Sequence, residues 1–215
     1  MEIWSVVSQK GGSGKTTLTL QLAIAAMAKD MLVSVIDLDP QRSAEQWSNF
    51  RKSKLDVDDR KEPVIVHGIP SDLDDMLKAA ASEDAQSDIT LIDTPPSVDK
   101  TMIYAAAAAS LVIVPTRTGI LDRFAVDETL DYLSKIQALS KTVVVLNATS
   151  NDKDAISDIK KFLKDKYKIK ILTTTIETHA DYSNSLGDGN GVVETMSRKK
   201  SAKSVRALYE ELCSI

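Results

Sequence analysis

The chain has a single cysteine, Cys213, among its 215 residues. This excludes an internal disulfide, and it also excludes an iron–sulfur or zinc site built from cysteines of one chain. No apolar run approaches the roughly 20 residues that a helix needs to cross a bilayer. The N-terminus, Met1–Trp4, shows neither a basic leader nor a small-residue cleavage site. We therefore expect a cytoplasmic protein without a membrane span.

The chain also lacks an excess of positive charge. Its 27 lysines and arginines are outnumbered by 31 aspartates and glutamates, which gives a formal net charge of -4. A general attraction to nucleic acid is thereby excluded, so any such contact must come from a local cluster. Two basic clusters are present. One contains Lys160, Lys161, Lys164, Lys166, Lys168 and Lys170, and the other contains Arg198, Lys199, Lys200, Lys203 and Arg206.

Short apolar runs alternate along the chain with longer amphipathic segments. This alternation is typical of an α/β fold, in which a doubly wound, mostly parallel sheet carries helices on both faces. We expect about seven strands, and several are apolar throughout, as in strands buried on both faces. Their ranges are Ile3–Ser8, Leu32–Asp37, Val64–His67, Ile89–Asp93, Leu111–Pro115, Thr142–Asn147 and Ile169–Leu172.

Apolar residues at helical spacing predict the helices between these strands. They share one face in the groups Val126, Leu130, Leu133, Ile136, then Ile156, Ile159, Phe162, Leu163, and finally Val205, Leu208, Leu212. No internal repeat, low-complexity tract or Pro/Gly-rich linker interrupts the pattern, so we expect a single domain over residues 1–215. The polar stretch Lys52–Lys61 is interpreted as a surface connection.

A glycine-rich segment follows the first expected strand and opens a helix. It consists of Lys10, Gly11, Gly12, Ser13, Gly14, Lys15, Thr16 and Thr17. Glycines let successive backbone N–H groups face one anion, and the helix N-terminus adds its positive dipole end. Lys15 would neutralise the β- and γ-phosphates, the Thr16 hydroxyl would ligate Mg²⁺, and Thr17 would donate to the α-phosphate. The alternative is a turn that only joins strand to helix, but the strand–loop–helix context favours nucleotide binding.

Two of the expected strands end in aspartates. Asp37 and Asp39 follow the second strand, and Asp93 ends the fourth. Parallel sheets bind ligands at this carboxyl edge, and phosphoryl transfer needs both Mg²⁺ and a positioned water. We predict that Asp37 and Asp93 support Mg²⁺ and that Asp39 orients or activates the water. Each aspartate could instead be a turn former or a helix cap.

The glycine-rich loop and the two aspartate strings together resemble the ParA family, within the deviant Walker ATPases that include MinD. The resemblance implies a Mg²⁺-dependent ATPase that forms an ATP-dependent sandwich dimer and turns over slowly without a partner. It implies that Lys10 reaches across the dimer to the other subunit's nucleotide and acts in catalysis with Lys15 and Asp39. It also implies that Gly12 lies where the two subunits meet and that Asn147 contacts adenine.

Later segments extend the resemblance over most of the chain. Val112–Thr116 is similar to the family's strand before the base-binding region. Ala180–Ser185, Gly187 and Val192–Glu194 are similar to the late loop that precedes the family's last helix. Glu177–His179 departs from the family pattern, because no arginine stands there.

The segment Asn151–Asp154 bears on the choice of base. Proteins that bind guanine nucleotides commonly recognise the base with an Asn-Lys-x-Asp motif after a strand. This segment contains those residue types in the wrong order. We interpret it as a helix cap with charged first-turn residues, which favours ATP over GTP.

The first of four candidate functions is a small, plasmid-type DNA-partitioning ATPase. ATP would close the dimer, the dimer would hold non-specific double-stranded DNA at the nucleoid, and a centromere-bound ParB-type partner would trigger hydrolysis and release. The cluster Arg198–Arg206 is the expected DNA contact, whereas the lysines between 160 and 170 are interpreted as a solvated helix face. Because the chain starts at its first strand, we expect no sequence-specific operator binding.

Three other functions remain open. A MinD-like membrane ATPase would need an amphipathic basic tail, but the tail Leu208–Ile215 is acidic. A metabolic or electron-transfer relative is disfavoured by the single cysteine and by Lys10. A switch that positions another cargo, such as a protein complex, differs from the first function only in its partner.

Overall fold

The computed structural model describes residues 1–54, 62–150 and 152–215. Its strands are β1 (Glu2–Val6), β2 (Val33–Asp37), β3 (Val64–His67), β4 (Ile89–Asp93), β5 (Leu111–Thr116), β6 (Thr142–Thr149), β7 (Lys170–Ile171) and β8 (Ile176–Glu177). The strand pairings are parallel, and the order across the sheet is β3-β2-β4-β1-β5-β6-β7, with β8 beside β6. This arrangement confirms the predicted α/β fold with a parallel sheet.

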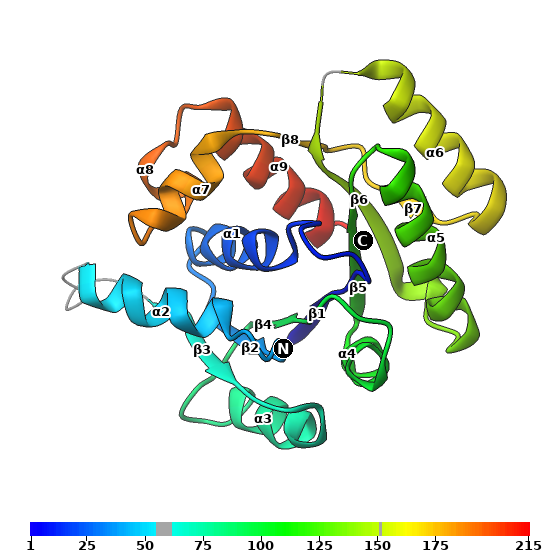
Figure 1. Ribbon diagram of the computed structural model, residues 1–215. Coiled ribbons are helices and arrows are strands. Elements are labelled where there is room, and N and C mark those ends of the chain that lie inside the picture. Colours follow the sequence, from blue (N-terminus) through cyan, green and yellow to red (C-terminus); the bar gives the residue numbers. More distant parts are fainter. Residues whose placement is uncertain (55–61, 151) are drawn as a thin grey trace.

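Helices cover both faces of this sheet (Figure 1). They are α1 (Lys15–Met27), α2 (Ser43–Lys54), α3 (Leu73–Ala80), α4 (Lys100–Ala108), α5 (Ile120–Lys135), α6 (Lys153–Tyr167), α7 (Ala180–Gly187), α8 (Val192–Thr195) and α9 (Lys200–Cys213). Helices α1, α2, α7, α8 and α9 contribute to one apolar core, and α3 to α6 contribute to the other. None of the described helices is long and apolar enough to span a membrane.

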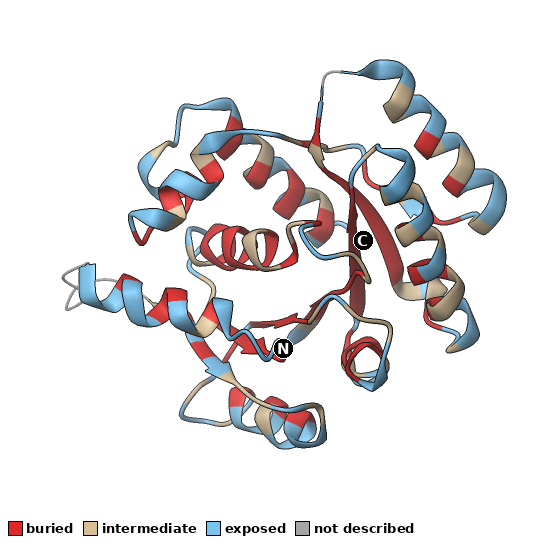
Figure 2. Cartoon of the chain, in the orientation of Figure 1, coloured by how far each residue is buried: buried red, intermediate tan, exposed pale blue. Residues whose placement is uncertain are grey.

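Side chains alternate between the two cores along each strand. On β5, Leu111 and Ile113 belong to the α1 side, whereas Val112 and Val114 belong to the α5 side. Figure 2 shows the result, with buried strands and a buried α1 in the middle and exposed outer surfaces on the other helices. A two-sided apolar strand is what a parallel sheet between helix layers requires.

The predicted strands correspond to β1 to β7, with ends that differ by one or two residues in most cases. The sequence reading missed β8, because two residues carry no periodic signal. It was also wrong about the late loop, since Ala180–Ser185 and Val192–Glu194 lie in α7 and α8. Within Lys52–Lys61, α2 continues to Lys54, and residues 55–61 lie outside the described part.

The predicted helix cap after β6 is confirmed at Asp152. Its Oδ1 accepts hydrogen bonds from the N–H groups of Asp154 at 3.1 Å and Ala155 at 3.0 Å. Asn151, the first residue of that prediction, lies outside the described residues. Helix α6 begins directly after this cap, at Lys153, so Asp152–Asp154 form the start of the helix.

The sheet register brings three strand ends together. Asp37 of β2 and Val6 of β1 are both register partners of Asp93 on β4. The loop that leaves β1 therefore runs over the aspartates at the carboxyl ends of β2 and β4. Because β1 lies in the middle of the strand order, this is the edge where open α/β sheets bind ligands.

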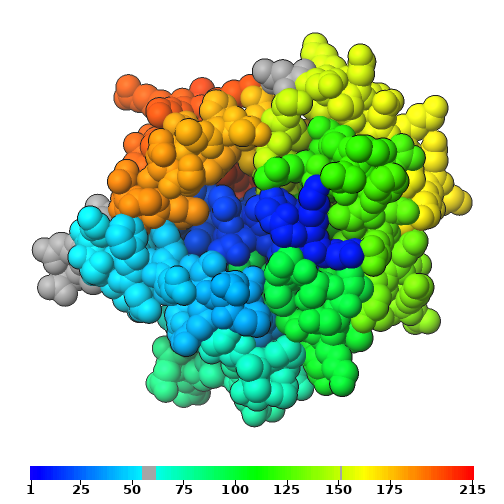
Figure 3. All heavy atoms as spheres, viewed as in Figure 1, coloured from blue at the N-terminus to red at the C-terminus, as the bar shows by residue number. Residues whose placement is uncertain are grey.

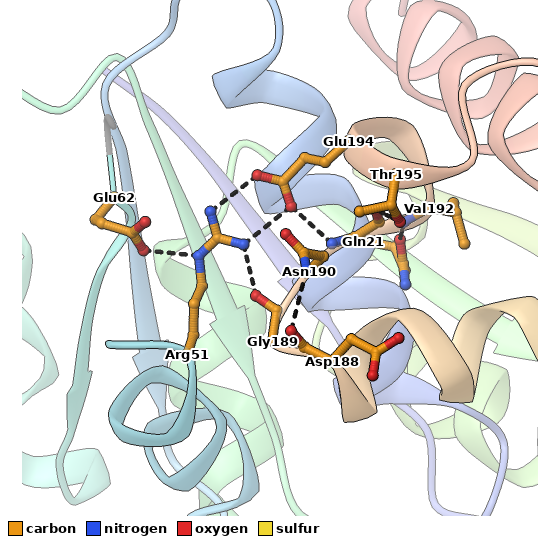
Figure 4. A network of polar contacts seen from close by, with 10 residues as sticks. Gln21, Arg51, Glu62, Asp188, Gly189, Asn190, Val192, Glu194 and Thr195 are labelled. Atoms are coloured by element: carbon orange, nitrogen blue, oxygen red, sulfur yellow. Dashed lines mark hydrogen bonds and ion pairs between the residues drawn. The ribbon is translucent and has the colours of Figure 1, made fainter. Parts of the chain in front are cut away.

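A buried arginine ties α2 to the C-terminal helices (Figure 4). Arg51 is 1% exposed, and its Nε donates to Glu62 at 2.7 Å. Its two Nη atoms donate to the carboxylate of Glu194 at 2.9 and 2.8 Å, and Nη1 also donates to the carbonyl oxygen of Gly189 at 2.7 Å. These four hydrogen bonds hold α2, Glu62 and the segment around Glu194 in a defined arrangement.

The same region contacts the helix that follows the glycine-rich loop. Gln21 of α1 accepts a hydrogen bond from the Val192 N–H at 2.9 Å and donates to the Ser185 hydroxyl at 3.2 Å. Glu194 accepts from the Gly191 N–H at 2.7 Å and so closes the start of α8. Together with Arg51, these contacts hold α1, α2, α7 and α8 in one arrangement.

Replacing Arg51 with methionine should destabilise the fold. The substitution R51M keeps most of the side-chain volume but leaves two partly shielded carboxylates without their cation, and breaking such a pair costs up to about 3 kcal/mol. Urea unfolding followed by circular dichroism measures the loss. R42M is the matched control, because Arg42 pairs with Glu45 on the exposed surface of the same helix region. Equal stability of the two variants would contradict the structural role of Arg51.

Candidate nucleotide-binding site

The loop between β1 and α1 depends on two glycines in left-handed backbone conformations. Gly12 has φ +72° and Gly14 has φ +87°, a region that side chains disfavour. A Cβ built on Gly14 would also collide with Nδ2 of Asn147. Figure 3 shows this N-terminal segment, in blue, in the middle of one face and surrounded by the cyan, green and orange parts of the chain. The loop therefore curls at an accessible surface.

The backbone amides of this loop are unpaired within the described part of the chain. Among the described residues, the N–H groups of residues 11–17 donate to no backbone or side-chain oxygen, and the first loop-to-helix bond runs from Leu18 to Gly14. The Ser13 hydroxyl is buried without a partner as well. Unpaired donors at a helix N-terminus form a site for an anion with several oxygens. The cradle therefore fits the phosphates of a nucleotide.

Lys15 places a buried cation at this cradle. Its side chain is 6% exposed, and Nζ donates to the carbonyl oxygen of Lys10 at 3.3 Å, across the loop. Burial lowers the pKa of Lys15, and the carboxylates of Asp93 and Asp39 offset part of this effect. An ammonium with one long hydrogen bond and little hydration is suited to receive a phosphate.

Thr16 and Asp93 form the second half of the site. The Thr16 hydroxyl donates to Oδ2 of Asp93 at 2.6 Å, and the Thr19 hydroxyl donates to Oδ1 at 3.3 Å. Burial raises the pKa of Asp93 to about 7, although the hydrogen bond from Thr16 opposes the shift. A hydroxyl and a carboxylate side by side are oxygen donors of the type that Mg²⁺ prefers, and a bound cation would favour the charged carboxylate.

Asp37 ends β2 and is the register partner of Asp93 on β4. It is fully buried, and its Oδ1 accepts from the Asp39 N–H at 3.0 Å. Its Oδ2 accepts from the N–H groups of Ala44 at 2.9 Å and Glu45 at 3.2 Å, at the start of α2. Burial raises the pKa of Asp37, and these donors oppose that rise. The contacts favour the helix-capping alternative for this residue.

Asp39 lies at the accessible end of the same strand connection. The residue is half-buried, and its Oδ1 accepts one hydrogen bond, from the Gln41 N–H at 2.9 Å. Its carboxylate is close enough to Lys15 to influence that residue's pKa. Oδ2 of Asp39 accepts no hydrogen bond from the described residues, so it is available to a water.

Two contacts at the loop involve residues that the sequence reading did not single out. Nζ of Lys10 donates to Oδ1 of Asp122 on α5 at 2.7 Å, and Nη2 of Arg117 donates to the carbonyl oxygen of Gly12 at 2.6 Å. Both partners follow β5 and are more than 100 positions away in the chain. No local pattern could have revealed them, because only the sheet order brings β5 next to β1.

Asn147 supports the loop from β6. Its Nδ2 donates to the carbonyl oxygen of Ser13 at 2.7 Å, and the residue is 7% exposed. The adenine contact expected from the resemblance would be additional to this hydrogen bond. In the structure itself, Asn147 fixes the position of the phosphate cradle.

Residues 4–193 match the family model described as the CobQ/CobB/MinD/ParA nucleotide binding domain. The chain belongs to this family. The match spans the glycine-rich loop, the aspartates at the strand ends and Asn147, and it ends within α8. This confirms the relationship to ParA and MinD that the motifs indicated.

Curated relatives and solved structures agree with the family. Maintenance of carboxysome distribution protein A from Halothiobacillus neapolitanus is 24% identical and aligns over 92% of this chain and 89% of its own length. Sporulation initiation inhibitor protein Soj from Bacillus subtilis is 22% identical, with 99% and 98% covered. The ATP complex of a Cyanothece McdA variant superposes with a TM-score of 0.77 at 18% identity over 100% of this chain and 97% of that one.

A MinD structure widens the comparison. The MinC:MinD complex from Aquifex aeolicus gives a TM-score of 0.80 at 16% identity and covers 100% of this chain and 97% of that chain. At such identities the superposition supports the fold. It agrees with the sheet order and with the helices on both faces.

The C-terminal basic cluster of this CobQ/CobB/MinD/ParA chain is largely engaged by its own acids and carbonyls. Lys199 pairs with Asp181 at 2.9 Å, and Lys200 pairs with Glu177 at 2.6 Å. Arg206 donates to two backbone carbonyl oxygens, those of Ser197 and Val193. Arg198 and Lys203 make no ion pair with any described residue and are exposed. The cluster is therefore less available to phosphates than the sequence indicates.

Proposed function

We propose that this chain is a Mg²⁺-dependent ATPase of the DNA-partitioning type. In this proposal ATP closes a sandwich dimer, the dimer binds double-stranded DNA without sequence preference, and partner-stimulated hydrolysis releases it. The observation that carries the nucleotide part is the set of unpaired amides at residues 11–17 beside the buried ammonium of Lys15. Family membership supports the same conclusion.

Each residue at the site has a proposed task. The amides of Gly11, Gly12, Ser13, Gly14 and the first turn of α1 would bind phosphate oxygens, and Thr17 would add a hydroxyl donor. Lys15 would neutralise the β- and γ-phosphates. Thr16 would contact the magnesium ion, which supplies positive charge between phosphate oxygens when bound. The described residues hold no cluster of three acidic, histidine or cysteine ligands, so phosphates would complete the coordination.

The remaining residues act around this centre. Asp93 would hold Thr16 and support the ion, and Asp39 would orient the attacking water. Asp37 would either support the magnesium ion or act through α2 and the backbone of Asp39, which it contacts. Lys10 would leave Asp122 to reach the nucleotide of the second subunit. Turnover would be slow until a ParB-type partner binds, and the protein would act in the cytoplasm, associated with the nucleoid when ATP-bound.

A second candidate is favoured by one comparison. The relative from Halothiobacillus neapolitanus is a carboxysome distribution protein, which points to a protein complex as cargo. The ATP cycle and the DNA contact would be the same, and only the stimulating partner would differ.

Fluorescence anisotropy of a random-sequence duplex tests the proposal. The titration is made with ATP, ADP and no nucleotide, each at two salt concentrations. Binding that requires ATP and weakens with salt would support a DNA-based positioning cycle. Confirmed ATP uptake without duplex binding in any state would remove the DNA part and leave the nucleotide site standing.

The C-terminal cluster makes a narrower prediction. Replacing the two unpaired cations together, R198Q with K203Q, should weaken binding on every duplex and lower the slope of log K against log salt by about 2, one per lost phosphate contact. The ion-paired K199Q with K200Q is the matched double variant and should have the smaller effect. An unchanged slope in the first variant would show that this cluster is a solvated surface.

A further inference from the structure

Helix α6 separates its charges into strips. Ile159 and Leu163 are buried, and Ile156, Phe162 and Tyr167 are half-buried, so one side of the helix packs on the α5 side of the molecule. At about 100° of rotation per residue, Lys153, Lys160 and Lys164 fall within an arc of about 40° beside this apolar side, and Lys168 follows the helix as its C-cap. We call these four residues the lysine strip. No acid of α6 lies in this arc, and Ser157 lies beside it.

The three acids of α6, Asp154, Asp158 and Asp165, lie on a neighbouring strip, at about 100° to 140° from Lys153 around the helix axis. Asp158 and Asp165 line the groove between α5 and α6, together with Arg123 and Phe162. The guanidinium of Arg123 lies 3.9 Å from the ring centre of Phe162, which marks this flank as the one that faces α5. The lysine strip therefore lies on the flank turned away from α5.

No acid of the described chain neutralises the lysine strip. None of its four lysines lies within ion-pair distance of a described carboxylate, whereas Lys166, on the α5 flank, pairs with Asp127 at 2.6 Å. Three strip residues are exposed and Lys160 is half-buried. The C-terminal cluster differs, because Lys199 and Lys200 are ion-paired. The chain has a net charge of -4, so this row of unpaired cations produces a local positive electrostatic potential on an otherwise negative protein.

We propose that the lysine strip is a contact surface for the phosphate backbone of duplex nucleic acid. The inference rests on the proposed function, since it adds a second DNA-contacting part of this chain to the C-terminal cluster. From Lys153 to its end at Tyr167, helix α6 rises about 21 Å at 1.5 Å per residue. Duplex DNA carries one negative charge per roughly 1.7 Å of axis, so several phosphates lie within reach of a helix of this length.

The surroundings of the strip favour nucleic acid over a lipid surface. A helix that binds at a membrane interface needs exposed bulky apolar residues beside its cations. The large apolar side chains that are exposed in the described chain include none on α6. The apolar side of α6 is already packed in the core, which leaves the cations as its accessible feature.

The test removes the charge and keeps the helix. The variant K153Q/K160Q/K164Q is compared with K29Q/K78Q/K135Q, which loses the same net charge at exposed lysines elsewhere, and glutamine preserves helix propensity. Anisotropy of a random-sequence duplex with ATP is measured over a salt series, and thermal unfolding checks the fold of both variants. We expect the strip variant to bind at least about tenfold more weakly and its salt slope to fall by about 3, with the control near wild type.

The outcomes separate the strip from the function on which it rests. Wild-type binding in the salt series decides whether the protein binds DNA, and its absence would overturn both the lysine strip and the DNA part of the proposed function. If wild type binds and the two triple variants behave alike, the strip is overturned while DNA binding stands. Binding to phosphatidylglycerol vesicles is measured as well. If the strip variant loses vesicle binding and keeps duplex binding, the strip is a membrane contact instead.

Discussion

K15A is expected to lose ATP affinity by on the order of 100-fold or more. The substitution removes a buried ammonium that would otherwise pair with phosphate charge, and truncating one partner of a buried charge pair costs about 2–5 kcal/mol of binding. The unpaired amides of residues 11–17 would still face the phosphates, so weak binding would remain. Titration with a fluorescent ATP analogue gives the affinity directly.

The control for this variant is K29A. Lys29 lies just beyond the opposite end of α1 and pairs with Glu210 on the surface, so its loss changes the same net charge without touching the loop. Thermal unfolding of both variants checks that the chain is folded. Wild-type ATP affinity in K15A would remove the central assignment of this site, whatever the turnover rate.

D39A is expected to bind ATP normally and to hydrolyse it about 100-fold or more slowly. The expectation follows if Asp39 positions or activates the water, because a placed general base contributes about 10²–10⁴-fold. Its free Oδ2 at the accessible end of the strand connection is the geometric reason for the choice. Phosphate release, measured with and without duplex DNA, gives the rate, and the ATP-bound dimer should accumulate in sedimentation.

D37A separates this role from a structural one. Asp37 accepts three backbone hydrogen bonds, so its loss should lower the unfolding free energy by about 1–2 kcal/mol. A stable D39A that cannot hydrolyse ATP, beside a destabilised D37A, is the expected pattern. Ordinary hydrolysis by D39A would transfer the water-positioning role to another group.

Much of this fold could be predicted because its signals are local. The alternation of apolar strands and amphipathic helices gave the parallel sheet, and the spacing of glycines around Lys15 gave the phosphate loop. The roles of Asp37 and Asp39 could not be separated in this way. Asp37 ends β2 and Asp39 lies two positions later, and the contact of Asp37 with the start of α2 becomes visible only in the fold.

The pairing of charged side chains could not be predicted, because it depends on contacts between residues far apart in the sequence. The acids that pair with Lys199 and Lys200 stand 18 and 23 positions earlier, on elements that the sequence reading assigned to a loop or missed. The reverse holds on α6, where Asp158 and Asp165 stand among the lysines in the sequence but lie on the flank that faces α5. Counting charges along a chain does not show which of them cancel in space.

The ion pair between Lys10 and Asp122 has a kinetic consequence for the proposed dimer. The ammonium of Lys10 lies 2.7 Å from Asp122 of its own chain, and this ion pair must break before Lys10 can bind the nucleotide of a second subunit. The Lys10 side chain is 34% exposed and that of Asp122 is 12% exposed. When the ion pair breaks, water therefore hydrates the separated charges only in part. Release is a first-order event, so raising the protein concentration speeds encounter but not release. Where release of Lys10 from Asp122 is slower than encounter of two subunits, the rate of dimer formation would stop rising with protein concentration. Its maximum would equal the rate constant for breaking the ion pair.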